Sequence, residues 1–138
     1  MRNDNVTKAV NVRSVPRSEA AVRSQGIPFQ KLDVYRASRE LAALVHRLDV
    51  RDAELRDQAT RAAKSTFLNL CEGLPDDRGA MRRKYFAQAD GSLHETAGAV
   101  DLAAAIGAVP QERADAVLVL AGRVRAMIKG LIRAGKVP

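Results

Sequence analysis

The sequence predicts an all-α protein, an antiparallel up-down-up-down four-helix bundle. Apolar residues recur at steps of three and four along four segments within residues 33–134, and no segment alternates for long enough to form a strand. The connections between the segments are short, which makes successive helices antiparallel neighbours. Hydrophobic residues make up 46% of the chain but aromatic residues only 4%, so the core must consist mainly of Ala, Leu, Val and Ile. Such side chains favour closely packed helices.

The first 28 residues differ from the rest of the chain. Residues 1–28 show no sustained period, and Pro16, Gly26 and Pro28 interrupt them. They hold five basic and two acidic side chains, and they lack the continuous apolar stretch of a secretory signal. The sequence therefore predicts a flexible basic tail over 1–28 and a four-helix bundle domain over 29–138.

The first two helices are predicted over about 33–49 and 52–71. In the first helix, Val34 and Leu41 belong to one apolar face while Arg36 and Arg39 lie outside it. Gly73 is expected to end the second helix, and the glycine- and proline-containing connection after it turns the chain.

The third and fourth helices are predicted over about 80–106 and 110–134. Gly107 is expected to end the third helix, and Pro110 is a favoured residue in the first turn of the fourth. The apolar face of the fourth helix is broad and ends before Gly135.

The charge of the chain is basic and unevenly distributed. Its net charge is +7 and its pI is about 10.2. Residues 110–138 alone carry six basic and two acidic side chains. This pattern favours an acidic partner such as nucleic acid or anionic lipid, although a basic surface can also serve solubility alone.

Two features bear on the compartment. Cys71 is the single cysteine, so no intramolecular disulfide can form and a reducing, cytoplasmic interior is expected. No apolar run approaches the roughly 20 residues of a membrane span, so no membrane partner is expected.

A polar stripe runs along the predicted second helix. Gln58, Ser65, Asn69 and Glu72 recur at helical spacing beside the apolar face, so they share one side of the helix. Such a stripe can belong to an active site, a metal site or a contact between helices.

Four motifs carry a resemblance to a known family. They are F-x-x-L-x-V-Y at 29–35, L-x-x-Q-x-x-R-A-A-x-S-x-x-x-N-x-x-E-G at 55–73, A-x-G-S-L-x-E at 89–95 and M-I-K-G-L-I at 127–132. Together they resemble the bacterial four-helix bundle proteins called 23S rRNA-intervening-sequence proteins, over about residues 29–134. The wider relatives of that family include the accessory variability determinant of diversity-generating retroelements.

The resemblance implies a small bundle that assembles as a homopentameric, barrel-like ring without established enzyme activity. The retroelement relative is a basic pentamer that works with a reverse transcriptase and nucleic acid. The family usually has S-I-P-S-N where this chain has S-T-F-L-N at 65–69. Without the proline the helix should be straighter, and Phe67 and Leu68 add bulk expected at a different helix or subunit contact.

Acid–base chemistry does not fit the expected pairing of the second and third helices. If Glu72 lies near residue 80, Ser65 lies near Gln88 and Gln58 lies near Glu95. Glu72 and Glu95 are then roughly 20 Å apart along the helix axis. Paired catalytic carboxylates for glycoside-type chemistry lie roughly 5–10 Å apart.

Metal and nucleophilic chemistry fit no better. A di-iron bundle needs Glu-x-x-His motifs, and neither His46 nor His94 follows a Glu at that spacing. Cys71 has no Cys or His at ligand spacing and reads as a small buried hydrophobe, while both histidines are expected at the surface. The sequence therefore predicts no cofactor, no metal and no enzymatic activity.

Packing between helices explains the polar stripe better than acid–base, metal or nucleophilic chemistry does. Gly91 and Ser92 have little bulk, so the second and third helices should approach closely there. Gln58 is then expected to hydrogen-bond Glu95, and Ser65 to meet Gln88, because buried polar groups need partners. Asn69 and Glu72 are expected to cap backbone groups or to face a neighbouring subunit. The stripe is thus predicted to hold helices or subunits in register.

Two basic clusters remain as candidate nucleic-acid-binding residues. The first lies at the start of the third helix, where positive charge opposes the helix dipole and favours a nearby anion. The second shares one face of the fourth helix. The residues are Arg78, Arg82, Arg83 and Lys84 in the first cluster and Arg125, Lys129, Arg133 and Lys136 in the second. Tyr85 and Phe86 are possible stacking residues, but their interpretation as core residues is preferred.

Three functions follow from these observations. The first is a non-enzymatic homo-oligomeric scaffold whose basic face binds RNA, DNA or a nucleic-acid enzyme such as a reverse transcriptase. The alternative is a protein–protein adaptor or assembly module that binds no nucleic acid and uses the basic tail as a tether. The third, an enzyme, has the least support.

Overall fold

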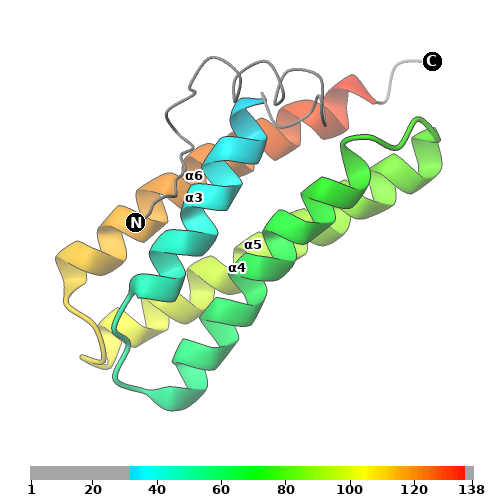
Figure 1. The fold of residues 1–138 in the computed structure, drawn as a ribbon. Helices are drawn as coiled ribbons and strands as arrows, with labels where there is room; N and C mark the ends of the chain where they lie inside the picture. The colour runs from blue at the N-terminus through cyan, green and yellow to red at the C-terminus, as the bar shows by residue number, and fades with distance from the viewer. Residues whose placement is uncertain (1–31, 136–138) are drawn as a thin grey trace, which may run out of the picture. The chain divides into compact units, whose positions relative to one another are not determined.

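Four α-helices make up the part of the chain that the structure describes. The structure is a computed structural model, and it describes residues 32–135, within which no strand occurs. The helices are α3 (Asp33–Arg47), α4 (Ala53–Gly73), α5 (Gly79–Ala105) and α6 (Gln111–Ala134), drawn in Figure 1. Each predicted helix boundary lies within two residues of the observed one, which confirms the all-helical prediction. The predicted tail and Lys136 lie outside the described residues.

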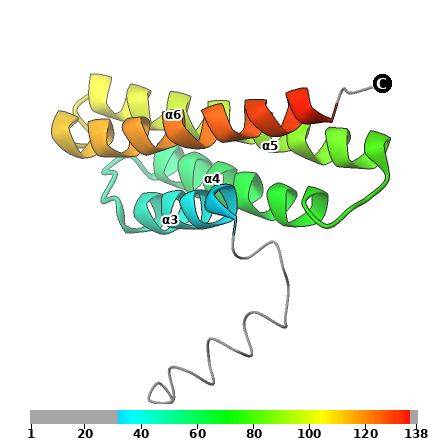
Figure 2. The ribbon, with the colours of Figure 1, turned by 90° about the horizontal axis from the view of Figure 1, so that it is seen from above.

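The helices pack as two pairs around one core. Each helix contacts the next one in sequence, and α3 also contacts α6. Figure 2 shows α3 and α4 in one layer and α5 and α6 in the other, so that α4 and α6 lie diagonally across the core. The largest fully buried side chains are Phe86, Leu41, Leu70, Leu93 and Ile128.

Alanines fill part of the core on both α4 and α5. Ala59 and Ala63 of α4 and Ala89 and Ala103 of α5 are almost completely buried. Small buried side chains suit closely packed helices, as the alanine-rich composition predicts. This helix pair also makes the most extensive contact in the bundle.

The two connections at one end of the bundle are hydrogen-bonded to each other. The backbone N–H of Arg51, between α3 and α4, donates to the carbonyl of Ala108, between α5 and α6, at 2.8 Å. Val50 and Val109, in the same two connections, are buried. At the start of α4, the side chain of Asp52 accepts a 2.9 Å bond from the N–H of Leu55 and so caps the helix.

Gly107 ends α5, as predicted. Its φ of +78° is a left-handed conformation that residues with a Cβ rarely adopt. The N–H of Ala108 reaches the carbonyl of Ala103, and the N–H of Gly107 reaches that of Ala104. These two bonds form a Schellman motif, which satisfies carbonyls at the helix end.

Candidate functional site

Ser65 joins α4 to α5 at the centre of the polar stripe. Its Oγ lies 2.8 Å from the Oγ of Ser92. The amide nitrogen of Asn69 donates to the carbonyl and the Oγ of Ser65, at 2.9 and 3.1 Å. On the opposite helix, Thr96 Oγ1 donates to the Ser92 carbonyl at 2.9 Å. The stripe therefore joins α4 to α5 at this level.

The predicted pairing of Ser65 with Gln88 is wrong by one helical turn. Ser65 meets Ser92 instead, and Gln88 is exposed. Gly73, at the end of α4, faces Tyr85 and Phe86 rather than residue 80. The first turn of α5 therefore lies beside the connection 74–78, and this moves every later residue of α5 by about one turn relative to α4.

Gly91, one of the small residues predicted to permit close approach, is not a close contact in the structure. A Cβ placed on Gly91 would meet no atom within 4 Å, so Gly91 is not a point of close packing within the chain. A Cβ on Gly73 would lie 2.9 Å from Cε1 of Phe86 and 3.0 Å from Cβ of Tyr85. At Gly73 the close approach of the two helices therefore requires a residue without a side chain. Gly73 is the last residue of α4 and does not lie beyond its end.

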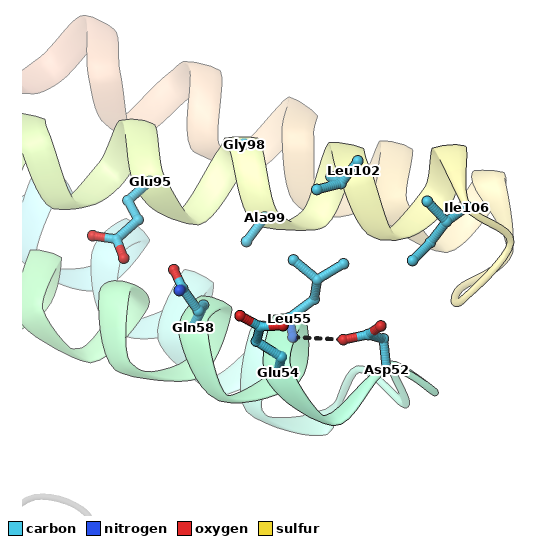
Figure 3. Close-up of a pocket in the computed structure, with 9 residues that line it drawn as sticks. All are labelled: Asp52, Glu54, Leu55, Gln58, Glu95, Gly98, Ala99, Leu102 and Ile106. Carbon is cyan, nitrogen blue, oxygen red and sulfur yellow. Dashed lines mark hydrogen bonds between the residues drawn. The ribbon is translucent and has the colours of Figure 1, made fainter.

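An open groove of about 580 Å³ lies between the first half of α4 and the second half of α5 (Figure 3). We call it the acidic groove; its lining residues are Asp52, Glu54, Leu55, Gln58, Glu95, Gly98, Ala99, Leu102 and Ile106. Three of these carry carboxylates and none is basic. Figure 3 shows Gln58 and Glu95 turned toward the same space from opposite walls. The expected hydrogen bond between them does not form.

Sequence reasoning missed this groove as a site. Its apolar wall includes Leu102 and Ile106, whose side chains are 51% and 56% exposed. The signal was present in the spacing, because Gly91, Glu95 and Gly98 precede these two residues at steps of four, three, four and four. All five therefore share one outward stripe of α5.

Asn69 and Glu72 do not cap the end of α4. Asn69 bonds back to Ser65 within the helix. Glu72 is exposed and lines a second open groove on α4 that also includes Arg61 and Lys64, two basic residues absent from the sequence prediction. Burial, and secondarily the charge of Glu72, raises the pKa of the neighbouring Cys71 thiol.

The two bulky residues that replace the family pattern face different surroundings. Phe67 packs on Tyr35 of α3, with ring centroids 5.1 Å apart and ring planes inclined by 54°. Leu68 is 58% exposed and lines the groove that contains Glu72. Phe67 is thus part of a helix contact, while Leu68 leaves an apolar side chain on the surface.

Arg82 has a structural role at the end of α4. Its Nη1 donates to the carbonyls of Leu74 and Gly73, at 2.6 and 3.2 Å. Its guanidinium also lies over the ring of Phe86, 4.9 Å from the centroid. The cation–π contact with the ring and the negative end of the helix dipole both stabilise a guanidinium in this position. Arg82 therefore has the capping role that was one of the two roles expected for Asn69 and Glu72.

Arg78 is paired as well. Its guanidinium contacts both carboxylate oxygens of Asp76, at 3.0 and 2.8 Å, and its N–H donates to one of them at 2.9 Å. The side-chain hydrogen bond from Arg78 is the main cause that lowers the pKa of Asp76 to about 2. The positive charge of Arg78 is thereby largely balanced within the connection.

The remaining basic candidates within the described residues are exposed. Arg83 and Lys84 are exposed on the first turns of α5, and Arg125, Lys129 and Arg133 are exposed on α6. A Cβ on Gly135 would lie 3.9 Å from Cγ of Arg83, so the start of α5 lies beside the end of α6. The structure thus places the start of α5, with Arg83 and Lys84, beside the end of α6, with Arg133, while Arg125 lies further along the bundle beside His94.

The aromatic residues beside the first basic cluster and the two histidines differ in burial. Phe86 is a core residue and Tyr85 is half-buried, while His46 and His94 are exposed. Within residues 32–135 no group of three metal-ligating side chains comes together. None of the helices described is long and apolar enough to cross a membrane.

Comparison with known proteins identifies a family. The sequence model of the 23S rRNA-intervening sequence proteins matches residues 30–130 of the chain. The match includes all four helices except the last few residues of α6. No curated protein matches the chain.

Proposed function

Because the chain belongs to the 23S rRNA-intervening sequence protein family, we propose that it is a non-enzymatic homo-oligomeric scaffold that binds nucleic acid through a basic surface. The bound molecule is RNA or DNA, or a nucleic-acid enzyme such as a reverse transcriptase. The oligomer is a pentameric ring of up-down-up-down bundles. A relation to the accessory determinant of diversity-generating retroelements and a cytoplasmic location are parts of this proposal.

The observation that carries the proposal is the basic surface shared by α5 and α6. We define the basic surface as the five exposed residues Arg83, Lys84, Arg125, Lys129 and Arg133, which begin where the start of α5 meets the end of α6 and continue along α6 to Arg125. From residue 116 to residue 135 the sequence contains no acidic side chain. Five uncompensated cations on one subunit attract phosphates, and a ring would repeat that surface around its axis.

The low reactivity expected of the Cys71 thiol supports the absence of enzymatic activity. Burial raises the pKa of Cys71, which lowers the fraction of reactive thiolate. The two glutamates that sequence reasoning considered as an acid–base pair line separate grooves, Glu72 beside Arg61 and Glu95 beside Gln58. An assay that found turnover abolished by Glu95→Gln in a folded protein would contradict this part of the proposal.

The test is a binding titration with a fluorescent oligonucleotide at several salt concentrations, on protein freed of nucleic acid. We expect log K to fall linearly with log salt, because each phosphate contact releases bound counterions. Replacing Arg125, Lys129 and Arg133 by Glu should abolish binding and leave the oligomer mass unchanged. The matched control replaces Arg36, Arg39 and Arg47 of α3, which are also exposed, by Glu.

The control separates position from net charge. Both triple variants change the charge of the chain equally, so equal loss of binding in the two would contradict a localised site. Binding of a single-stranded probe that does not respond to salt would also contradict it.

The alternative is an adaptor that binds protein and no nucleic acid. The acidic groove favours it, because its exposed leucine and isoleucine with flanking carboxylates are features of protein contacts rather than phosphate contacts. Light-scattering mass with ultraviolet absorbance on protein purified without nuclease distinguishes the two. The chain has no Trp and two Tyr, so nucleic acid carried with it would dominate the absorbance.

A further inference from the structure

The acidic groove carries an apolar surface that the bundle itself does not cover. Leu102 and Ile106 are more than half exposed and lie beside the half-buried Leu55. Single exposed apolar residues are ordinary, but a group of them along one groove is typical of a contact site. Gly98, one turn from Glu95 on the same stripe, keeps the groove open to an incoming helix.

The charge of the groove limits what can fill it. Asp52, Glu54 and Glu95 line it, and no basic side chain does, although the chain carries a net charge of +7. The N-cap bond occupies one oxygen of Asp52. Glu54 and Glu95 are exposed and form no ion pair with any residue in the part of the chain that the structure describes. A complementary surface must therefore be apolar with at least one cation.

The outward side of α6 has that composition. Val119, Arg123, Ala126 and Gly130 follow one another at steps of four, three and four, so they form one stripe, which we call the outer stripe of α6. Val119 is 66% exposed, the highest value among the exposed large apolar residues described. Arg123 is exposed and, within residues 32–135, has no acidic partner.

The groove and the stripe belong to opposite parts of the bundle. The groove lies between α4 and α5, while Val119, Arg123 and Ala126 of the outer stripe are exposed on α6, which is diagonal to α4 (Figure 2). One molecule therefore cannot bring the two together. A contact between the groove of one copy and the stripe of the next is heterologous, and repetition of such a contact generates a ring or a filament.

We propose that the acidic groove is a subunit interface that receives the outer stripe of α6 from a second copy of the chain. In this contact Val119 packs against Leu102 and Ile106, and Arg123 lies against Glu95. The small side chains at Gly98 on one side and Ala126 on the other let the two helices approach closely. The proposal rests on the homo-oligomeric ring of the proposed function and names its contacting surfaces.

The interface leaves the nucleic-acid surface accessible on the neighbouring side of α6. Arg125 lies in the seam between α6 and α5, beside Leu93, His94 and Ala97. It is therefore not part of the outer stripe, although it is two residues from Arg123.

A charge swap tests the pairing by light-scattering mass on nuclease-treated protein. Glu95→Arg and Arg123→Glu should each reduce the mass from that of the ring to that of the 14.9 kDa chain. The double variant Glu95→Arg/Arg123→Glu should restore the ring, because it reverses the charges without removing the pair. Glu40→Arg on α3 is the matched control and should keep the ring, since Glu40 is exposed outside both surfaces.

An apolar substitution gives a second, independent measurement. Ile106→Asp should abolish the ring because it would bury an unpaired carboxylate among apolar side chains. Helical content by circular dichroism should stay at the wild-type value in every variant, since all the altered side chains are exposed in the single chain.

The outcomes separate this proposal from the function on which it rests. A wild-type ring that survives Glu95→Arg, Arg123→Glu and Ile106→Asp overturns this interface and leaves the ring intact. Failure of the double variant to restore a ring that both single variants dissociate overturns the pairing of Glu95 with Arg123. A wild-type protein that runs as one chain overturns the proposed assembly itself.

Discussion

Replacement of Gly73 by Ala should destabilise the bundle, against the usual preference of helices for alanine. A Cβ at this position would lie 2.9 Å from Cε1 of Phe86 and 3.0 Å from Cβ of Tyr85. Carbon atoms in contact ordinarily lie about 3.5–4.0 Å apart, so the new methyl group would overlap both side chains by about 0.5–1 Å. Neither neighbour can move easily, because Phe86 is only 1% exposed and the Cβ of Tyr85 moves only with its backbone.

The magnitude follows from two opposing terms. Forcing an extra methyl group into a packed core costs about 1–3 kcal/mol. Alanine in place of glycine gains up to about 1 kcal/mol in a helix interior, and less at the last residue of a helix, where Gly73 lies. We therefore expect a net loss of about 1–2 kcal/mol in the free energy of unfolding, which lowers Tm by several degrees in a domain of this size.

Gly91→Ala is the control, because a Cβ there would meet no atom within 4 Å. Gly91 lies inside α5, so this variant should gain about 0.5–1 kcal/mol from the reduced flexibility of the unfolded chain. The assay is denaturant unfolding followed by far-ultraviolet circular dichroism at several protein concentrations. The concentration series separates folding from subunit association.

A double variant tests the physical cause. If the Phe86 ring causes the strain, Gly73→Ala/Phe86→Leu should be less destabilised than the sum of the two single variants. A Gly73→Ala protein as stable as Gly91→Ala, or strictly additive effects in the double variant, would refute the packing argument.

Three further outcomes can be measured on the same protein. Arg82→Ala should lower the free energy of unfolding by about 1–3 kcal/mol, because it removes the cap on the α4 carbonyls and the contact with the Phe86 ring. The exposed neighbour is the control: Arg83→Ala should change the free energy of unfolding by less than about 0.5 kcal/mol. Ser65→Ala should cost about 1 kcal/mol, and a double-mutant cycle with Ser92→Ala should show coupling, since the two hydroxyls bond each other. The pKa of Asp76 in the folded state is about 2, below the ordinary value of 3.8. The stabilising contribution of its carboxylate is therefore fully present above pH 3.8 and is lost as the pH falls toward 2. The Tm values of wild type and Asp76→Asn should differ at neutral pH and converge at acid pH, and a constant difference would contradict the pairing with Arg78.

The helices were predictable from the sequence because their signals are local. The period of the apolar residues, Pro110 at the start of α6 and Gly107 after α5 are each recognised within a few positions of the sequence. Burial of Ala59, Ala63 and Ala89 likewise follows from the apolar face and the scarcity of aromatic residues. These features depend little on how one helix is placed against another.

The register between α4 and α5 was not predictable from the same signals. It depends on how many residues of α5 run beside the connection 74–78, and that is fixed by the bonds from Arg82 to two carbonyls. A shift of one turn keeps the same helix faces in contact, so the periodicity cannot reveal it. For the same reason Gly91 and Gly73 could not be told apart by spacing alone.

The candidate site was partly predictable. The polar stripe was recognised from its spacing, and Ser65 of the stripe contacts Ser92 of α5 in the structure. The pairing of Arg78 with Asp76, two residues earlier, was available in the sequence but was masked by the run of basic residues that follows. The groove that contains Leu102 and Ile106 was missed because exposed apolar residues resemble core residues in sequence.

The position of Arg82 has a consequence for how the family can vary. Four basic residues occur within seven positions at the start of α5, and any of them can change type if only charge matters. Arg82 is the exception, because a lysine ammonium cannot reach two carbonyls and lie flat on the Phe86 ring at once. Among relatives we therefore expect arginine to be retained at this position wherever residue 86 is aromatic, while Arg83 and Lys84 vary between lysine, arginine and neutral residues.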